Sequence, residues 1–356
     1  MRIAIDAREL LGTPTGVGRY LRSILAAWNE LPGAAAHQYV FCTPSAWHDH
    51  TLPNLETTRR TGGGRGTMFE QARLPLMIGD ADVLFAPGYS GPLVTRVPMV
   101  VTIHDVSFSA HPEWFAWREG LRRRVVTRLS AHRAARIITV SDFSKREIVS
   151  HLGVPSTKVE VIYSGTTRLA TPPATRQPTV LFVGSLFNRR HVPELIDGFT
   201  RMAIRHPEVR LEIVGDNRTT PRIDIDRLIE QSAARERIRA RSYLADDELA
   251  ALYASASAFA FLSDYEGFAM TPLEALGAGV PVVLLETEVA REIYGPAATY
   301  VERPDPELIA GALERVLFDQ AERMRLVSTA AATLDRYSWR ECAQRTLQVL
   351  LSCARS

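Results

Sequence analysis

The feature that most constrains the fold of this 356-residue chain is an alternation of short apolar runs with segments of helical periodicity. Each run is nearly continuously apolar, and strands of that kind separated by helices are typical of a parallel sheet covered on both faces. In the first half, we expect strands at 2–6, 38–42, 82–86, 98–104, 135–141 and 159–165. In the second half, we expect them at 178–184, 210–215, 258–263 and 280–285.

A Pro- and Thr-rich stretch, residues 168–178, interrupts this alternation and is the best candidate for a linker. The sequence therefore predicts an α/β protein with two Rossmann-like, doubly wound domains, residues 1–170 and 171–338. A last helix, from about 339 to 356, can pack back on the first domain. Open α/β sheets bind ligands beyond the carboxyl ends of their strands, so we expect the two domains to face a central cleft.

The composition is that of an ordinary globular protein, with 46% hydrophobic and 23% charged residues. A net charge of +2 is too small to indicate a nucleic-acid partner. The three cysteines, Cys42, Cys342 and Cys353, match no metal-binding spacing, which favours a reducing compartment. Asp6 and Arg8 stand where a signal peptide needs apolar residues, and no segment reaches the ~18 apolar residues of a membrane span. We therefore expect a cytoplasmic protein.

Two glutamates, Glu266 and Glu274, stand in an otherwise apolar or small segment that follows the expected strand 258–263. Thr271 and Pro272 are typical of a helix start, and with Thr271 as N-cap the Glu274 carboxylate can close a capping box. A helix N-terminus at a strand end also favours an anion such as a diphosphate. Carboxylates on both sides of that anion can accept hydrogen bonds from sugar hydroxyls, which indicates a nucleotide sugar. For Glu274 alone, capping and ligand binding are about equally supported.

The stretch YEGFAMTPLEALGAGVPVV, residues 265–283, resembles the E-x7-E signature of the family 4 retaining glycosyltransferases, which have the GT-B fold. The resemblance implies that Glu274 binds the nucleotide ribose. It also implies that Glu266 contacts the donor sugar and belongs to the catalytic residues. Four backbone amides are implied to lie against the diphosphate: those of Phe268, Ala269, Met270 and Thr271. By the same resemblance, the first domain binds the acceptor and the second binds the nucleotide sugar.

Arg189 and Arg190 follow the expected strand 178–184. Two adjacent arginines are usually solvated, but at such a strand end they can clamp a phosphate. The segment resembles the basic loop of the same family, which neutralises the leaving diphosphate. The resemblance assigns both arginines to the donor diphosphate and Arg190 to catalysis. His191 stands where the family usually has a small residue.

In the first half, His104 ends the expected strand 98–104 in a His-Asp pair. Such a histidine is more often structural, but the family's H-D motif implies that His104 faces the donor sugar and is catalytic. Asp105 can orient the ring or start a turn.

Gly16 and Gly18 permit positive φ and close backbone approach above a helix that begins near residue 19. The family's T-G-V-G-R-Y variant contacts the donor phosphates or the acceptor, although a tight turn explains Gly16 nearly as well.

The resemblance further implies that backbone groups near Gly215, Tyr243 and Leu244 frame the nucleotide base. Asp224 and Asp226 form a D-x-D pair, which holds a metal ion in another glycosyltransferase fold, but their context predicts a helix N-terminus. We therefore expect no metal cofactor, because the arginines can stabilise the leaving diphosphate.

Residues 117–136 form a basic helical segment with an apolar stripe of Leu121, Val125 and Leu129. The favoured interpretation is a solvated helix docked on the sheet. The alternative is attachment to anionic lipid, which would suit a lipid-linked acceptor. Three aromatic residues lie nearby in the sequence, Trp114, Phe115 and Trp117.

The resemblance implies a hexosyltransferase that moves a hexose or deoxyhexose, with mannose from GDP-mannose as the first choice, to a hydroxyl of a glycan or lipid-linked acceptor. Its expected setting is polysaccharide or O-antigen-type biosynthesis at the inner face of a membrane, without a nucleic-acid partner. Two alternatives stay open: a GT-B sugar-nucleotide epimerase, and a non-catalytic subunit that binds a nucleotide sugar.

Overall fold

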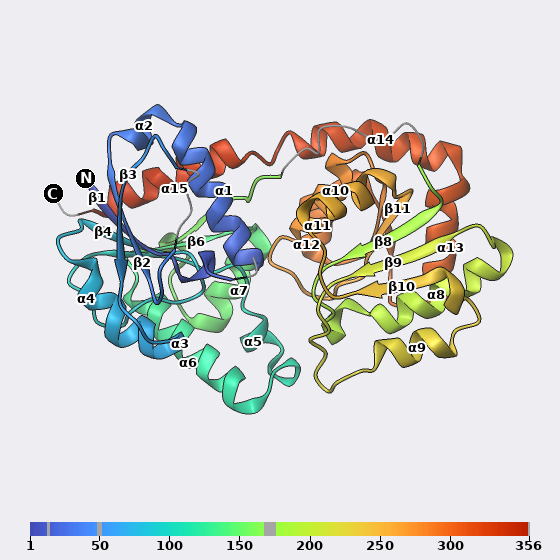
Figure 1. Cartoon of the computed structure of the whole chain (residues 1–356), viewed down its shortest axis with the longest axis horizontal. Coiled ribbons are helices and arrows are strands. Elements are labelled where there is room, and N and C mark those ends of the chain that lie inside the picture. The colour runs from blue at the N-terminus through green and yellow to red at the C-terminus, as the bar shows by residue number, and fades with distance from the viewer. Residues whose placement is uncertain (13–14, 48–51, 167–175, 355–356) are drawn as a thin grey trace. The chain divides into compact units, whose positions relative to one another are not determined.

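A computed structural model describes residues 1–12, 15–47, 52–166 and 176–354 (Figure 1). The chain divides into two compact units, one formed by Met1–Gly165 with Tyr337–Ser356 and the other by Thr166–Arg336. The predicted linker lies largely outside the described residues, as does the predicted domain boundary at residue 170. None of the helices in the described ranges combines the length and the apolar character that a membrane span requires.

The first unit is built on a seven-stranded sheet in the order β3-β2-β1-β4-β5-β6-β7. All neighbouring strands are parallel. The chain winds from β1 towards one edge and from β4 towards the other, so the topological switch point lies between β1 and β4. The strands are β1 (Arg2–Asp6), β2 (Gln38–Thr43), β3 (Glu56–Thr61), β4 (Val83–Ala86), β5 (Met99–Thr102), β6 (Arg136–Thr139) and β7 (Val159–Val161).

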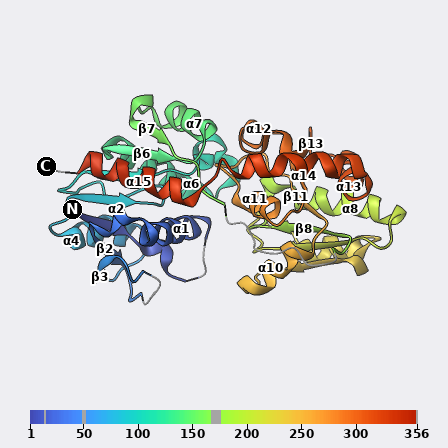
Figure 2. The ribbon, with the colours of Figure 1, turned by 90° about the horizontal axis from the view of Figure 1, so that it is seen from above.

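Two helices that are far apart in the sequence, α1 (Gly16–Glu30) and α15 (Trp339–Cys353), lie side by side in this unit (Figure 2). Trp28 of α1 is fully buried, and its indole N–H donates to the carbonyl of Ala343 on α15 at 2.8 Å. The remaining α- and π-helices are α2 (Pro32–Ala35), α3 (Gly66–Met68), a π-helix (Phe69–Arg73), α4 (Leu74–Ile78), α5 (Ser107–Ala110), α6 (Trp117–Arg133) and α7 (Asp142–Leu152), and 3-10 helices cover Arg8–Leu10, Pro112–Trp114 and Ser156–Lys158.

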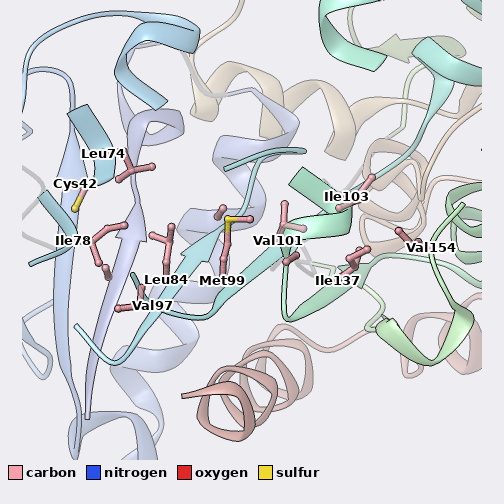
Figure 3. Packing of buried hydrophobic residues seen from close by; sticks show 14 of the residues in the cluster. Cys42, Leu74, Ile78, Leu84, Val97, Met99, Val101, Ile103, Ile137 and Val154 are labelled. Carbon is pink, nitrogen blue, oxygen red and sulfur yellow. The ribbon is translucent and has the colours of Figure 1, made fainter. Parts of the chain in front are cut away.

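Figure 3 shows a core cluster of this unit, where side chains from neighbouring strands meet those of α4. Leu84, Met99 and Val101 are fully buried in the sheet, and Leu74 and Ile78 pack against the same cluster from α4. Each such side chain contributes roughly 1.5–3 kcal/mol by leaving water. The near-continuous apolar character of the strands follows from their burial on both faces.

The second unit is a six-stranded parallel sheet in the order β10-β9-β8-β11-β12-β13. Its switch point lies between β8 and β11. The strands are β8 (Thr179–Val183), β9 (Arg210–Val214), β10 (Ile238–Arg241), β11 (Ala258–Phe261), β12 (Val282–Leu285) and β13 (Ala298–Val301). Figure 1 shows α10 and α11 on one face of this sheet and α8 with α9 on the other. The α-helices are α8 (Val192–Arg205), α9 (Ile225–Gln231), α10 (Asp246–Ser255), α11 (Met270–Gly277), α12 (Glu288–Tyr294), α13 (Pro306–Phe318) and α14 (Gln320–Leu334), and 3-10 helices cover Asn188–Arg190, Arg235–Arg237 and Gly295–Ala297.

The doubly wound α/β prediction is confirmed in both units. Three strands were not predicted, β3, β10 and β13, and all three are edge strands. An edge strand has a neighbour on one side only, and β3 in particular is polar and largely exposed. β3 therefore lacks the apolar run by which the inner strands are found, whereas β13 is largely buried.

The predicted docking of α6 through Leu121, Val125 and Leu129 is wrong, because these side chains are 41%, 47% and 48% exposed. The helix instead buries a line of small residues, and the Ser130 hydroxyl accepts a hydrogen bond from the Gly91 N–H at 2.8 Å. Small residues allow the helix to approach the sheet closely, so this face is buried and the larger apolar stripe is left outside. The buried residues of α6 are Gly120, Thr127, Ser130 and Ala131.

Candidate functional site

The candidate residues of the second unit lie on loops that follow strands at the switch point of its sheet. Arg189 and Arg190 follow β8, while Glu266 follows β11, and β8 and β11 are adjacent strands. Parallel sheets of this kind bind ligands at that position. The fold therefore brings the predicted arginines and the predicted donor-sugar glutamate together.

A network of hydrogen bonds ties the two loops to each other. Arg190 donates to Glu266 Oε1 through Nε at 2.8 Å, and the Ser263 hydroxyl donates to the same oxygen at 2.8 Å. The Asp264 N–H donates to the Arg189 carbonyl at 2.9 Å, and Arg189 Nε donates back to the Tyr265 carbonyl at 3.2 Å. Arg190 and Glu266 are therefore an ion pair with side chains that are 13% and 14% exposed.

Gly184 makes room for the Arg190 guanidinium. Its φ is +148°, and a Cβ at this position would lie 2.7 Å from Arg190 Nη1. That nitrogen donates to the Ser185 carbonyl at 2.9 Å, and the guanidinium stacks over the ring of Phe261. The arginine is therefore fixed in place at the end of β8 before any ligand is bound.

His191, next to the arginine pair, is a third cation in this loop. Burial lowers its pKa, but hydrogen bonds to Asp264, at 2.7 Å, and to Glu194 outweigh burial and raise the pKa to about 9. His191 has a φ of +49°, a left-handed conformation that is uncommon for residues other than glycine. The charged pair with Asp264 adds another link between the two loops.

The predicted start of α11 at Thr271 is wrong. The N-cap is Ala269, in a left-handed conformation with φ +61° and without a side-chain capping bond, and the helix begins at Met270. Pro272 is tolerated in the first turn because its missing N–H would have no partner there. The Tyr294 hydroxyl donates to the Ala269 carbonyl and so holds the chain where the helix begins. Glu274 therefore lies too far along the helix for a capping box.

The Glu274 carboxylate instead accepts a hydrogen bond from the Tyr253 hydroxyl of α10 at 3.1 Å. This contact orients Glu274, and Tyr253 is in turn buried and stacked on Phe259 of β11. Tyr253 was not predicted as a site residue, although it stands in the segment 240–256 that carries the resemblance near the base.

Gly215, Tyr243 and Leu244 lie on the loops after β9 and β10, at the same carboxyl edge of the sheet. Gly215 has a φ of +151°, and a Cβ there would collide with the carbonyl of Gly184. The Tyr243 side chain is 60% exposed, while Leu244 is buried.

Asp224 is the N-cap of α9 and accepts from the Arg227 N–H at 3.0 Å, which confirms that this aspartate marks a helix N-terminus.

In the first unit, His104 follows β5 and contacts the rings of Tyr20 and Tyr89, with centroid distances of 4.8 and 5.5 Å. Burial lowers the pKa of His104, so the ring is neutral at pH 7. Nε2 lies 2.9 Å from the Pro87 carbonyl, which only accepts, so Nε2 carries the proton and Nδ1 is an acceptor. Asp105 starts a turn by accepting from the Ser107 N–H at 2.8 Å.

Gly16 and Gly18 lie in the first turn of α1, which begins earlier than predicted, with Thr15 as N-cap. Both have helical backbones, so neither uses the positive φ that glycine permits. Close approach is confirmed for Gly18, where a Cβ would collide with the Glu9 carbonyl. The Gly18 N–H donates to Thr15 Oγ1 at 3.1 Å. A phosphate at this helix start would therefore meet only the backbone amides that precede Gly18.

A group of charged residues at the switch point of the first unit was not predicted. Arg8 follows β1 and forms ion pairs with Asp6, at 2.9 Å, and with Glu70 of the π-helix. Glu70 also accepts from the Ser90 hydroxyl, after β4, at 2.9 Å. Burial raises the pKa of Asp6 to about 6, against the opposing effect of Arg8. Their position directly after a predicted strand was the available signal for Asp6 and Arg8.

Two protein-family models match the chain. Residues 14–167 match Glycosyltransferase Family 4, and residues 166–333 match Glycosyl transferases group 1. O-antigen chain mannosyltransferase B of Escherichia coli is 27% identical over 269 residues, which cover 70% of this chain and 68% of that protein. MMP alpha-(1->4)-mannosyltransferase of Mycolicibacterium hassiacum is 27% identical over 271 residues, 71% of this chain and 64% of that protein.

A solved structure of Anabaena HepE (Alr3699) in complex with UDP-glucose has the same fold. It matches with a TM-score of 0.79 at 20% identity and covers 99% of this chain and 100% of that one.

Proposed function

This chain belongs to the family 4 glycosyltransferases with the GT-B fold, and from that premise we propose that it is a retaining hexosyltransferase. It transfers a hexose or deoxyhexose, with mannose as the first choice, from a nucleotide diphosphate sugar to a hydroxyl of a glycan or lipid-linked acceptor. GDP-mannose is the proposed donor because two relatives are named mannosyltransferases. HepE was solved in complex with UDP-glucose, so UDP sugars are the alternative donors to be tested.

The observation that carries the proposal is the network that joins Arg190 and Glu266 at the switch point of the second unit. A diphosphate against Arg189, Arg190 and the first amides of α11 would meet positive charge and a helix N-terminus. The bonds to Ser185 and Glu266 hold the plane of the Arg190 guanidinium at this strand end. Its charge stabilises the negative charge that develops on the leaving diphosphate, which is how Arg190 contributes to catalysis.

Glu274 binds the ribose hydroxyls in this proposal, oriented by Tyr253. Glu266 and the Nδ1 acceptor of His104 contact donor-sugar hydroxyls, and main-chain groups near Gly215 and Leu244 frame the base. The acceptor hydroxyl attacks the same face from which the diphosphate departs, and a departing phosphate oxygen takes its proton. No metal ion is needed, because guanidinium and amide groups carry the leaving-group charge.

Calorimetry and steady-state kinetics test this assignment of roles. Glu274→Ala should weaken nucleotide binding roughly tenfold or more, as expected for two lost hydrogen bonds to a charged group. Arg190→Ala should lower kcat more than it weakens binding, and Asp226→Ala, in the unrelated D-x-D pair, should change neither. Activity should survive EDTA. Unchanged binding and turnover in both site variants would contradict the assignment.

Product analysis separates the alternatives. A sugar-nucleotide epimerase releases free nucleotide without a sugar acceptor, a transferase yields a glycosylated product, and a non-catalytic subunit consumes no donor. A thermal-shift panel of GDP, UDP and dTDP identifies the base beforehand.

A peripheral contact with the inner face of an anionic membrane is part of the proposal. Trp117 is 73% exposed, and it continues the exposed stripe of Leu121, Val125 and Leu129 along α6. An apolar stripe with arginines on both sides is typical of helices that lie in a membrane interface. The flanking arginines are Arg118, Arg122, Arg124 and Arg128. Such a contact would bring the enzyme to a lipid-linked acceptor from the cytoplasmic side.

A further inference from the structure

The charged group at the switch point of the first unit has no part in the donor site proposed above. Its residues follow the two strands that flank the switch point or come from the π-helix: Asp6, Arg8, Glu9, Glu70 and Ser90. We call it the Arg8 cluster. A switch point is where a doubly wound sheet binds its ligand, and the corresponding position of the second unit holds the donor-site residues.

The Arg8 guanidinium is anchored on one side and open on the other. Its Nη2 pairs with Asp6 Oδ2 at 2.9 Å and with Glu70. Within the described residues, Nε and Nη1 of Arg8 make no hydrogen bond, and neither atom is fully enclosed in a side chain that is 17% exposed. Because two buried carboxylates fix the side chain, its free donors have a set direction.

Glu9, the next residue along the chain, supplies a carboxylate that interacts electrostatically with Arg8. One carboxylate oxygen of Glu9 accepts from the Thr15 hydroxyl at 3.1 Å, and Thr15 in turn caps α1. The Glu9 side chain also lies against Gly88, after β4, where an added Cβ would be 3.6 Å from Cγ. Glu9 therefore borders both strand ends of the switch point.

The charge balance of the Arg8 cluster selects the kind of ligand. Above pH 6, three carboxylates stand against one guanidinium, and burial raises the pKa of Asp6 only to about 6. A phosphate or carboxylate ligand would meet net negative charge and be repelled. A neutral polyol can accept from the free Arg8 N–H groups and donate to Glu9 without that penalty.

We propose that the Arg8 cluster is the acceptor subsite and that it binds the hydroxyl groups of a neutral sugar residue, with Arg8 as donor and Glu9 as acceptor. The proposal rests on the proposed function, since it names the class of acceptor for the same reaction. It excludes a phosphate on the acceptor sugar unit next to this cluster.

Acceptor binding is tested on the full chain with methyl α-mannoside, methyl α-glucoside and the 6-phosphates of both, by saturation-transfer NMR without donor and by transfer kinetics with the best donor. The neutral glycosides should bind at least about tenfold more tightly than their phosphates, the cost of one or two unfavourable charge contacts. Glu9→Gln should raise the KM for the neutral glycoside about tenfold. It should leave the KM for the donor and acceptor-independent donor hydrolysis within about twofold.

Arg8→Lys keeps the positive charge that pairs with Asp6 and Glu70 but removes the guanidinium donors Nε and Nη1. This variant should therefore fold and lose affinity for the acceptor, as Glu9→Gln does. Glu30→Gln, at the far end of α1, is the matched control and should change nothing. Equal or tighter binding of the phosphates, an unchanged acceptor KM in Glu9→Gln, or no glycoside binding to the wild type would overturn the proposal. The proposed function fails separately, if no nucleotide sugar stabilises or is consumed by the wild type.

Discussion

His191 places a third positive charge beside Arg189 and Arg190, and its left-handed backbone makes the position unusual for a histidine. The family resemblance has a small residue here, which adopts this conformation at lower cost. The ion pair with Asp264 offsets the cost and also links the arginine loop to the Glu266 loop. A single residue thus combines local strain, charge and loop alignment.

Stability should therefore depend on pH through His191. Its folded pKa, about 9, lies above the ordinary value of 6.5, so the contribution is complete below pH 6.5 and is lost as pH rises through 9. His191→Asn should lower the unfolding midpoint by about 2–4 °C at pH 6 and by little at pH 10. Thermal unfolding across this range measures the difference, with His151→Asn as a control on the partly exposed pair with Glu147. If the difference in unfolding midpoint between the wild type and His191→Asn stayed constant with pH, it would contradict a stabilising role for the charged His191.

Among the elements, α15 is the one whose position least follows from its place in the chain. It lies after the second unit in sequence but belongs to the first, where it packs on α1. Gly165 lies against the start of α15, since a Cβ there would collide with the backbone of Trp339. The buried hydrogen bond from Trp28 to Ala343 fixes the two helices against each other.

Trp28→Phe should destabilise the first unit by about 1–3 kcal/mol, because it leaves the Ala343 carbonyl without its indole donor and opens a small cavity. Trp117→Phe is the matched control, since Trp117 is 73% exposed and should cost nearly nothing. Urea denaturation of both variants measures the two costs. Similar midpoints for the two variants would mean that the α1–α15 contact contributes little.

Over the whole molecule, the small net charge of +2 conceals an uneven distribution, because α6 combines its arginines with an exposed apolar stripe. A surface of this kind binds anionic lipid through both apolar burial and charge attraction. The second unit also exposes large apolar side chains, among them Met324 and Val327 on α14, at 59% and 60%. These two residues provide a comparison for the α6 stripe.

Vesicle flotation tests the membrane contact. The wild type should bind vesicles that contain phosphatidylglycerol but not pure phosphatidylcholine, and about 0.5 M salt should weaken binding because it screens charges. Leu121→Glu with Val125→Glu should abolish flotation, whereas Met324→Glu with Val327→Glu should leave it unchanged. Equal behaviour of the two double variants, or binding to neutral vesicles, would argue against a role for α6.

Several features were predictable because they depend only on residues that are close together in the sequence. Inner strands appear as apolar runs, since both of their faces are buried, and the loops after β8 and β11 were found with Arg189, Arg190 and Glu266. Asp224 was assigned to a helix N-terminus from its neighbours alone, and the structure confirms it as the N-cap. The edge strand β3 was missed because half-exposed strands do not need an apolar pattern.

Other features depend on partners that are distant in the chain. Helix periodicity cannot tell which of two plausible faces of α6 is buried, and close packing of Ser130 near Gly91 decides it. The start of α11 is set by Tyr294, which holds the Ala269 carbonyl from a later helix. Likewise, Arg190 and Glu266 become an ion pair only because β8 and β11 are neighbours. The chain itself specifies which chemical groups stand at strand ends, whereas the order of strands decides which of those groups meet.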